Sequence, residues 1–264
     1  MKIVLTGWNG FIGRNIMKTL IDVHDIDELI LIESDFTSKP SWERNLEVGI
    51  DSCDSIIHLG ANVDTTDNNV DSMLKSNYLM SKKIFDLAKK YDKQVIYSSS
   101  AANYGTDGTP SNIYGWSKLL AENHGLALGI DFVALRYFNV YGPGEERKGK
   151  MASVAYQAWK LGSFRIFPKK ATRDFVYVKD IVSATIYPLF NNVEPGVYDV
   201  GCGESRLFED VLDLMEIPYE YTSDYEIPSW YQFYTKSDKS KWIPGWEPEY
   251  NLESGIKDYK EYLK

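Results

Sequence analysis

The first 13 residues carry the pattern that most constrains the fold of this chain. A short apolar run, Lys2–Leu5, leads directly into three evenly spaced glycines, Gly7, Gly10 and Gly13. Glycines with this spacing between a strand and a helix permit a tight turn, close approach of the backbone to a pyrophosphate, and close packing of the helix on the strand. A tight connection without a ligand is the alternative. The position of the turn between strand and helix at the start of the chain favours a nucleotide site.

Alternating apolar and amphipathic segments follow the glycine turn. Four further strands are predicted, at residues 29–32, 54–61, 93–97 and 131–135. Helices are predicted over 70–91 and 113–128, and also directly after the glycine turn, where one side carries Ile12, Ile16, Leu20 and Ile21. This alternation predicts an α/β fold with a doubly wound parallel sheet, whose ligands bind beyond the carboxyl ends of the strands. Residues 35–53 look irregular, and no third strand is predicted there.

An acidic residue, Glu33, ends the second predicted strand, 20 residues after Gly13. A carboxylate at this distance can accept hydrogen bonds from both hydroxyls of a cofactor ribose. It would also repel a 2′-phosphate, and the nearest following cation is Lys39. These features favour NAD over NADP. An acid that simply ends a strand in solvent is the alternative.

The strand at 54–61 ends in small residues, Gly60-Ala61, which would let a cofactor approach the backbone closely. A polar loop, 62–69, then leads into the predicted helix 70–91, which contains Asn77. A buried asparagine at that place could bind the loop backbone or contact a cofactor. The sequence favours neither role.

The chemistry is predicted to lie between Ser98 and Lys118. Three hydroxyls, Ser98-Ser99-Ser100, follow a strand, and Tyr114 and Lys118 come four positions apart on a predicted helix. The two side chains then share one helix face, where an ammonium group favours the phenolate and lowers the tyrosine pKa from about 10. Ser100 could hydrogen-bond a substrate hydroxyl or carbonyl. The set predicts proton transfer during oxidation of an alcohol, although the same Tyr–Lys spacing is common in ordinary surface pairs.

The pattern changes after Arg136, and a second lobe is predicted. A turn-rich segment, 137–144, and a charged loop, 145–150, are followed by helices and strands at 151–161, 164–167, 173–178, 179–190 and 196–200. The tail is rich in Tyr, Trp and Pro, and its aromatic residues are predicted mainly to pack a small irregular α/β lobe. We expect residues 1–140 and about 176–203 to form a dinucleotide-binding domain. Residues from about 141–175 and 204–264 would form a substrate lobe.

Charge and residue usage exclude several classes of function. The formal net charge is −9 and no basic block occurs, which argues against nucleic acid or an anionic membrane as a partner. The two cysteines are too few for a disulfide framework, and the three histidines lack ligand spacing, so no metal site is expected. No apolar run reaches the length of a membrane span. A soluble cytoplasmic protein is expected.

Together these segments resemble the extended short-chain dehydrogenase/reductases that act on nucleotide sugars, the NAD-dependent epimerase/dehydratase family. The motifs run in the family's order and comprise the glycine turn, Ser98-Ser99-Ser100-Ala101, Tyr114-x-x-x-Lys118, the segment 136–143 and the segment 173–178. The resemblance implies an NAD(P)-dependent enzyme with a nucleotide-diphosphate sugar as substrate, and a homo-oligomer. It also implies cofactor contacts from Gly7, Asn9, Gly10, Phe11, Ile12, Gly13, Glu33, Ser34, Leu59, Gly60, Ala61, Asn77, Tyr114, Lys118 and Val140.

Within that family, the segment Lys148-Gly149-Lys150-Met151-Ala152-Ser153-Val154-Ala155 is most similar to the ADP-L-glycero-D-manno-heptose 6-epimerases. The similarity implies Tyr114 and Lys148 as two acid/base groups on opposite faces of the sugar. Ser100 would assist, and Lys118 would hold the ribose and lower the tyrosine pKa. Substrate contacts are implied for Asn139, Lys150, Gln157, Phe167, Arg173 and Tyr231, with Arg173 as the diphosphate clamp.

The chain departs from these epimerases at Arg147, Lys150 and Gln157, and the segments before Asp54 and at 168–172 are shortened. Alternatives within the fold are a 4-epimerase, dehydratase or reductase acting on another nucleotide sugar. A dehydratase usually has an acidic pair beside the serine, whereas here Ser100 is followed by two alanines. A non-catalytic NAD-binding protein is the alternative from another class, and the intact Ser100, Tyr114 and Lys118 set argues against it.

Overall fold

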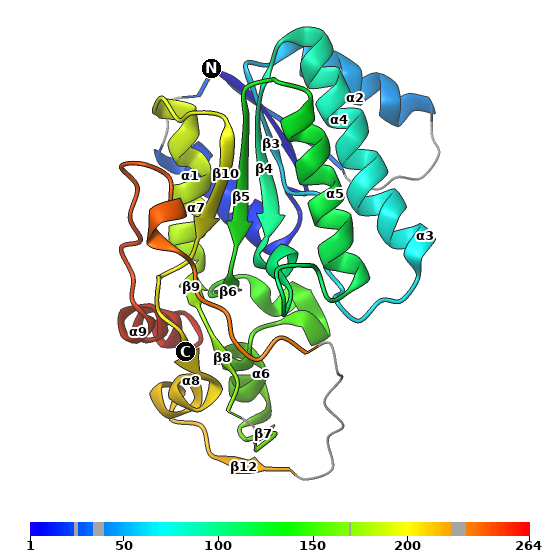
Figure 1. Cartoon of the computed structure of the whole chain (residues 1–264). Helices are drawn as coiled ribbons and strands as arrows, with labels where there is room; N and C mark the ends of the chain where they lie inside the picture. Colours follow the sequence, from blue (N-terminus) through cyan, green and yellow to red (C-terminus); the bar gives the residue numbers. More distant parts are fainter. Residues whose placement is uncertain (24–25, 34–39, 169, 223–230) are drawn as a thin grey trace.

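A six-stranded parallel sheet forms the centre of the molecule (Figure 1). The computed structural model describes residues 1–23, 26–33, 40–168, 170–222 and 231–264. The sheet order is β10-β5-β4-β3-β1-β2. Its strands are β1 (Lys2–Thr6), β2 (Glu28–Ile32), β3 (Ser55–His58), β4 (Gln94–Ser100), β5 (Phe132–Tyr137) and β10 (Gly196–Val200). The predicted doubly wound parallel sheet is confirmed, and the order reverses between β1 and β3, where such sheets bind ligands.

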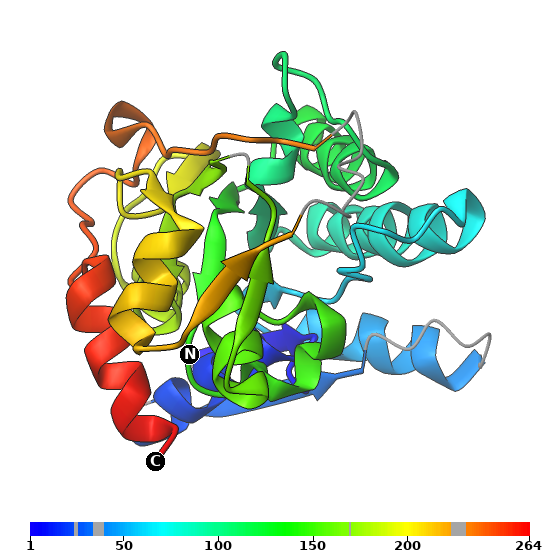
Figure 2. The same cartoon turned by 90° about the horizontal axis from the view of Figure 1, so that it is seen from below.

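Helices cover both faces of the sheet (Figures 1 and 2). On one face lie α1 (Phe11–Val23) and α7 (Val178–Phe190), and on the other α2 (Pro40–Ser52), α4 (Met80–Tyr91) and α5 (Ile113–Ala127). Successive strand residues point to opposite faces, so Ile3 and Leu5 join one core while Val4 and Ile56 join the other. On α1, Ile16 and Leu20 are fully buried as predicted, whereas Ile21 is 62% exposed and the prediction for it was wrong.

The segment predicted to be irregular before β3 contains a 13-residue helix, α2. No strand occurs in residues 40–53, in agreement with the prediction. The helix was missed because its apolar face is narrow. Leu46, Ile50 and Cys53 are buried against the sheet, and Val48 on the outer side is 62% exposed.

The predicted helix 70–91 is present but contains a π-helical turn. It consists of α3 (Val70–Met73), the π segment η1 (Leu74–Leu79) and α4. Asn77 lies within the π segment and is fully buried. A π turn inserts one extra residue per turn, and such turns are frequent at functional sites.

The rest of the chain builds a smaller α/β lobe below the sheet in Figure 1. Three two-stranded sheets pair β6 (Asn139–Tyr141) with β9 (Phe175–Tyr177), β7 (Phe164–Ile166) with β12 (Tyr219–Tyr221), and β8 (Thr172–Arg173) with β11 (Arg206–Leu207). The helices of the lobe are α6 (Val154–Leu161), α8 (Phe208–Met215) and α9 (Leu252–Tyr262). The described residues also contain three short 3₁₀ segments, η2 (Ala101–Tyr104), η3 (Glu145–Met151) and η4 (Lys239–Lys241). The lobe has its own apolar core, which includes Phe175, Leu212 and Ile256.

Asp174 divides the strand predicted at 173–178 into β8 and β9. Its buried carboxylate accepts hydrogen bonds from the backbone N–H groups of Cys202, Gly203 and Ser237 and from the Ser237 hydroxyl. Burial raises the pKa of Asp174, and these hydrogen bonds oppose the rise. The carboxylate therefore joins three segments of the chain where the lobe meets the sheet. Among the helices that the structure describes, none is long and apolar enough to cross a membrane.

Candidate active site

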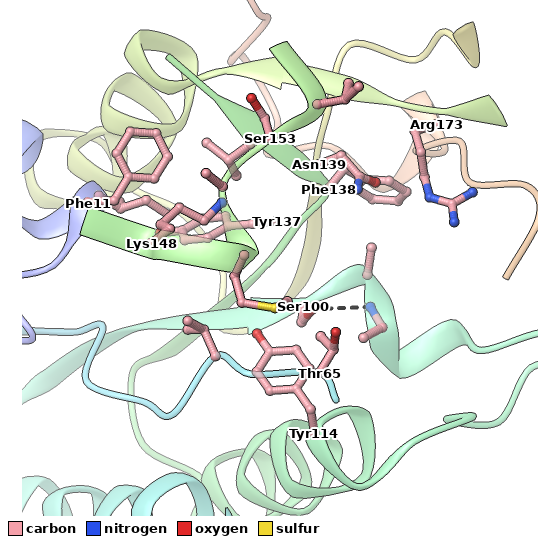
Figure 3. A pocket seen from close by; sticks show the side chains of 18 of the residues that line it. Phe11, Thr65, Ser100, Tyr114, Tyr137, Phe138, Asn139, Lys148, Ser153 and Arg173 are labelled. Atoms are coloured by element: carbon pink, nitrogen blue, oxygen red, sulfur yellow. Dashed lines mark hydrogen bonds between the residues drawn. The ribbon is translucent and has the colours of Figure 1, made fainter. Parts of the chain in front are cut away.

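One cavity of about 1210 Å³ lies between the carboxyl ends of the sheet strands and the smaller lobe (Figure 3). The glycine turn after β1, the end of β3, the end of β4, the start of α5 and the 3₁₀ segment η3 all contribute to its walls. Residues of β7, β8 and α8 line the part formed by the smaller lobe. The volume is large enough to hold a dinucleotide and a second small molecule together.

The glycine turn provides a cradle that side chains would fill. Gly7 has φ +68°, and a Cβ there would lie 2.7 Å from the Gly60 nitrogen. A Cβ on Gly13 would overlap the Gly7 carbonyl oxygen and lie 2.7 Å from the Trp8 Cα. The backbone is therefore bare where α1 begins, and the positive end of the helix dipole faces the cavity.

Glu33 follows β2 and also lines this part of the cavity. Its place at the end of β2 agrees with the sequence analysis, and its contact with a cofactor ribose stays a prediction. The bare glycine turn, the start of α1 and this carboxylate fit the phosphates and ribose of a dinucleotide such as NAD.

Tyr114 and Lys118 lie on α5 at the edge of the cavity, and Ser100 ends β4 beside them. The helix begins at Ile113 because the Asn112 side chain accepts a hydrogen bond of 2.8 Å from the Gly115 nitrogen. This cap places Tyr114 in the first turn. The predicted helix and the shared face of Tyr114 and Lys118 are confirmed.

The Lys118 side chain is 2% exposed and has no hydrogen bond or ion pair to any residue that the structure describes. Burial lowers its pKa to about 7, and the nearby Glu122 carboxylate opposes the fall. Burial also raises the pKa of Tyr114, while a hydrogen bond with Ser100 lowers it. The sequence predicted that Lys118 would lower the Tyr114 pKa. In the chain alone this prediction was wrong, because the loss of water around the phenol outweighs the hydrogen bond with Ser100.

Lys148 enters the cavity from the wall opposite Tyr114 (Figure 3). It lies on η3, and its ammonium is 5.3 Å from the centroid of the Phe11 ring. Burial lowers the Lys148 pKa, and the Glu145 carboxylate opposes the fall. The base of the segment is held by Glu145, whose carboxylate accepts from the Gly142 nitrogen and from the nitrogen and hydroxyl of Ser153.

Arg173 brings a positive charge to the part of the cavity lined by the smaller lobe. Its guanidinium lies 5.0 Å from the centroid of the Tyr231 ring and 5.6 Å from that of Phe208. Burial lowers its pKa, although an arginine stays charged at neutral pH. A buried guanidinium facing a cavity is suited to bind a diphosphate. Asn139, Gln157, Phe167 and Tyr231 line the same cavity, as predicted.

Most of the other predicted cofactor contacts also line the cavity, namely Asn9, Gly10, Phe11, Ile12, Leu59, Gly60, Ala61 and Val140. Asn77 does not line it. The Asn77 side chain accepts from the Asn62 nitrogen and donates to the Asn62 oxygen and the Ser117 hydroxyl, so it binds the loop backbone. Ser34 and Lys39 lie outside the described residues.

Lys150, predicted to bind substrate, points away from the cavity. Its ammonium pairs with the Asp64 carboxylate at 2.8 Å and donates to the Thr66 hydroxyl at 3.0 Å. Gly149, with φ +55° and ψ −124°, reverses the backbone between Lys148 and Lys150, and this reversal explains why one lysine faces inward and the other outward.

Two acidic residues at the site were not predicted from the sequence. Glu145 is fully buried and anchors η3, and Glu209 lines the cavity and accepts a hydrogen bond of 3.2 Å from the Tyr221 hydroxyl. The turn Gly142-Pro143-Gly144 directly before Glu145 was the available signal for a capped segment. Nothing in the local sequence singles out Glu209.

Comparisons with known proteins agree with this geometry. The model of the NAD dependent epimerase/dehydratase family matches residues 3–201. An ADP-L-glycero-D-manno-heptose-6-epimerase of Brachyspira hyodysenteriae is 30% identical over an alignment 316 positions long, which covers 99% of this chain and 98% of the relative. The enzyme of the same name from Cupriavidus pinatubonensis is 28% identical over an alignment 327 positions long, which covers 100% of this chain and 98% of the relative.

Solved structures show the same fold. The ADP-L-glycero-D-manno-heptose-6-epimerase of Helicobacter pylori superimposes with a TM-score of 0.85 at 27% identity, covering 99% of this chain and 96% of that one. The UDP-glucose 4-epimerase of Thermus thermophilus, solved in complex with NAD, gives a TM-score of 0.83 at 21% identity and covers 100% and 99%.

Proposed function

This chain belongs to the NAD dependent epimerase/dehydratase family, and we propose that it is an epimerase that inverts C6 of an ADP-heptose. The family and the placement of Ser100, Tyr114 and Lys118 support an NAD-dependent nucleotide-sugar epimerase. The choice of ADP-heptose rests on relatives at about 30% identity, which carry that activity in their names.

A single observation carries the proposal. Tyr114 and Lys148 enter one cavity from opposite walls (Figure 3). Inversion of a carbinol carbon requires a proton to leave the hydroxyl on one face and a proton to return after the carbon has presented its other face. Two acid/base groups on facing walls meet that requirement.

Bound NAD would supply the hydride acceptor for the oxidation and the hydride donor for the reduction. One of Tyr114 and Lys148 takes the hydroxyl proton as the carbinol becomes a ketone. The other gives a proton to the ketone oxygen when the inverted alcohol forms, so the sugar regains the proton it lost, and proton exchange with solvent then returns both groups to their starting states. The Ser100 hydroxyl can hydrogen-bond the reacting oxygen, and Arg173 holds the diphosphate.

We also propose that the two parts of the chain bind different ligands, as expected from the sequence. Residues 1–140 with about 176–203 would hold the cofactor, and about 141–175 with 204–264 the nucleotide sugar. This is supported by the separate apolar core of the smaller lobe and by Arg173, which lies in that lobe. A homo-oligomer remains a prediction, which light scattering of the purified protein would test.

Proton NMR of the purified protein with ADP-D-glycero-D-manno-heptose and no added cofactor tests the function. Conversion to the 6-epimer would support an ADP-heptose substrate and a redox cycle that needs no external reagent. If the sugar is unchanged while mass spectrometry finds bound NAD, the ADP-heptose assignment fails. A panel of UDP-sugars would then separate a 4-epimerase from a dehydratase or reductase, since the last two release a dehydrated or reduced product.

A further inference from the structure

An exposed ion pair connects two walls of the cavity near Lys148. Lys150 at the tip of η3 contacts Asp64 at 2.8 Å and Thr66 at 3.0 Å. Asp64 and Thr66 belong to the loop that follows β3, and the neighbouring residues Val63 and Thr65 line the cavity. Figure 3 shows Thr65 and Lys148 in the same cavity. The ion pair therefore joins the loop after β3 to the segment that carries a proposed acid/base group.

The loop side of this contact is well anchored. One Asp64 oxygen accepts from the nitrogen and the hydroxyl of Thr66, at 2.9 and 2.6 Å, which leaves the other oxygen for Lys150. The Asp64 nitrogen donates to the Asn62 side chain at 3.0 Å, and the Asn62 nitrogen donates to the buried Asn77 at 2.7 Å. Hydrogen bonding with Lys150, together with that from Thr66, lowers the Asp64 pKa to about 2, so the carboxylate is charged at every working pH.

The η3 segment has a firm base and a tip with few hydrogen bonds, since apart from the contacts of the Lys150 ammonium only the Gln157 side chain, which donates to the Lys150 carbonyl at 3.4 Å, holds it from outside residues 145–153 among the described residues. Glu145 and Ser153 fasten its two ends together at 2.6 and 2.8 Å. Between them Gly149 reverses the backbone, with Lys148 on the inner side and Lys150 on the outer. A contact made by Lys150 on the outer side consequently limits the movement of Lys148, two residues away.

We propose that Asp64 and Lys150 are positioning residues that hold the tip of η3 against the loop after β3 and so keep Lys148 in place for proton transfer. This rests on the proposed role of Lys148.

The ion pair is expected to affect the opening of the η3 tip and not the stability of the whole domain. Exposed ion pairs add little to the stability of a whole domain, and their attraction falls with salt. A loop tip held by few contacts opens at a small cost in free energy, so one such pair can govern its opening. Misplacing a catalytic group by an ångström can slow a reaction by about 10²-fold.

The first experiment is hydrogen exchange of the η3 backbone, read by mass spectrometry on nucleotide-free protein. Asp64→Asn keeps the acceptor for Thr66 but removes the charge, and Lys150→Met removes the ammonium but keeps a similar stem. Each should accelerate exchange in residues 145–151 about tenfold while the melting temperature stays unchanged. The double variant D64N/K150M should exchange no faster than either single variant, because the two changes remove the same contact. Raising the salt to 1 M should accelerate exchange in the wild type and not in K150M.

Lys90→Met is the matched control, because Lys90 pairs with Glu47 at 2.7 Å on the outside of α4, far from η3. It should leave exchange in η3 unchanged. Exchange at the wild-type rate in D64N and K150M would overturn the proposal, and so would a double variant D64N/K150M that exchanges much faster than either single variant.

Kinetics provide the second readout. A positioning role predicts that K150M lowers kcat about tenfold and leaves KM for the nucleotide sugar unchanged. A raised KM with unchanged kcat would show that Lys150 contacts substrate instead, and would overturn the positioning role. If the wild type epimerises no nucleotide sugar, the proposed function fails. The exchange experiment still decides whether Asp64 and Lys150 hold the tip of η3.

Discussion

The ammonium group of Lys118 lies 4.3 Å from the centroid of the Tyr97 ring, deep in the wall of the cavity. His58 stacks on the same ring with centroids 5.6 Å apart, and burial, with Lys118 adding to it, lowers the His58 pKa to about 3. The histidine is therefore neutral, and Glu122 is the carboxylate that favours the charged lysine. Since burial lowers the Lys118 pKa to about 7, its charge at neutral pH depends on what else occupies the cavity.

The first prediction concerns stability against pH in nucleotide-free protein. Between the folded Lys118 pKa of about 7 and the unfolded value of about 10.4, the unfolded chain binds one more proton. The free energy of unfolding contributed by this group therefore rises with pH, by up to about 1.4 kcal/mol per unit. Lys118→Met lacks this rise. The variant should be more stable than the wild type at pH 7, and the difference in their free energies of unfolding should shrink as the pH rises to 9.5. Urea unfolding at three pH values measures the difference.

Lys90→Met is the control for that experiment, because Lys90 is exposed and paired, and its pKa is raised. A plot of its free energy of unfolding against pH should run parallel to that of the wild type over the same range. If the Lys118→Met curve also ran parallel, Lys118 would keep an ordinary pKa in the folded protein.

The second prediction separates two glycines of the same turn. A Cβ on Gly13 would overlap the Gly7 oxygen, whereas one on Gly10 would lie 3.3 Å from it. Gly13→Ala should therefore displace the turn and weaken NAD binding at least tenfold, and Gly10→Ala should weaken it much less. Isothermal titration of nucleotide-free protein with NAD measures both. Equal affinities would mean that the turn adapts to a side chain at either place.

The parts of the site that the sequence predicted correctly depend on short-range geometry. Glycines at 7, 10 and 13 after an apolar run permit only a few turns, and Tyr114 and Lys118 share a face on any helix. The placement of Lys148 opposite Tyr114 came from similarity to a family. No local pattern relates η3 to α5, because the tertiary fold brings them together.

The predictions that failed depended on tertiary contacts. Burial decides the direction of the Tyr114 pKa, and the sequence does not show how completely a phenol loses water. Lys150 faces outward because Gly149 adopts a left-handed conformation, which the sequence permits but does not require. Helix α9 was not predicted, although Leu252, Ile256 and Tyr259 have helical spacing and are buried.

The third prediction concerns Asn77, whose role the sequence left open. Its side chain is fully buried and hydrogen-bonds both backbone groups of Asn62 and the hydroxyl of Ser117. Asn77→Ala leaves these partners unsatisfied and should lower the free energy of unfolding by about 3 kcal/mol. Asn69→Ala, which removes an exposed N-cap from the same helix, should cost about 1 kcal/mol. Equal costs in urea unfolding would argue against a structural role for Asn77.

The last prediction tests the two acid/base groups with changes that keep side-chain volume. Tyr114→Phe removes only the phenolic hydroxyl, and Lys148→Met replaces the ammonium with a thioether stem. Each should lower kcat for epimerisation by about 10²–10⁴-fold, the usual contribution of a positioned acid or base, with KM changed little. Mass spectrometry should still find NAD bound to each variant, because the glycines of the turn and Glu33 are unchanged. If Lys148→Met turned over at the wild-type rate while Tyr114→Phe did not, Tyr114 would both take the hydroxyl proton and return it, and the assignment of two acid/base groups would fail.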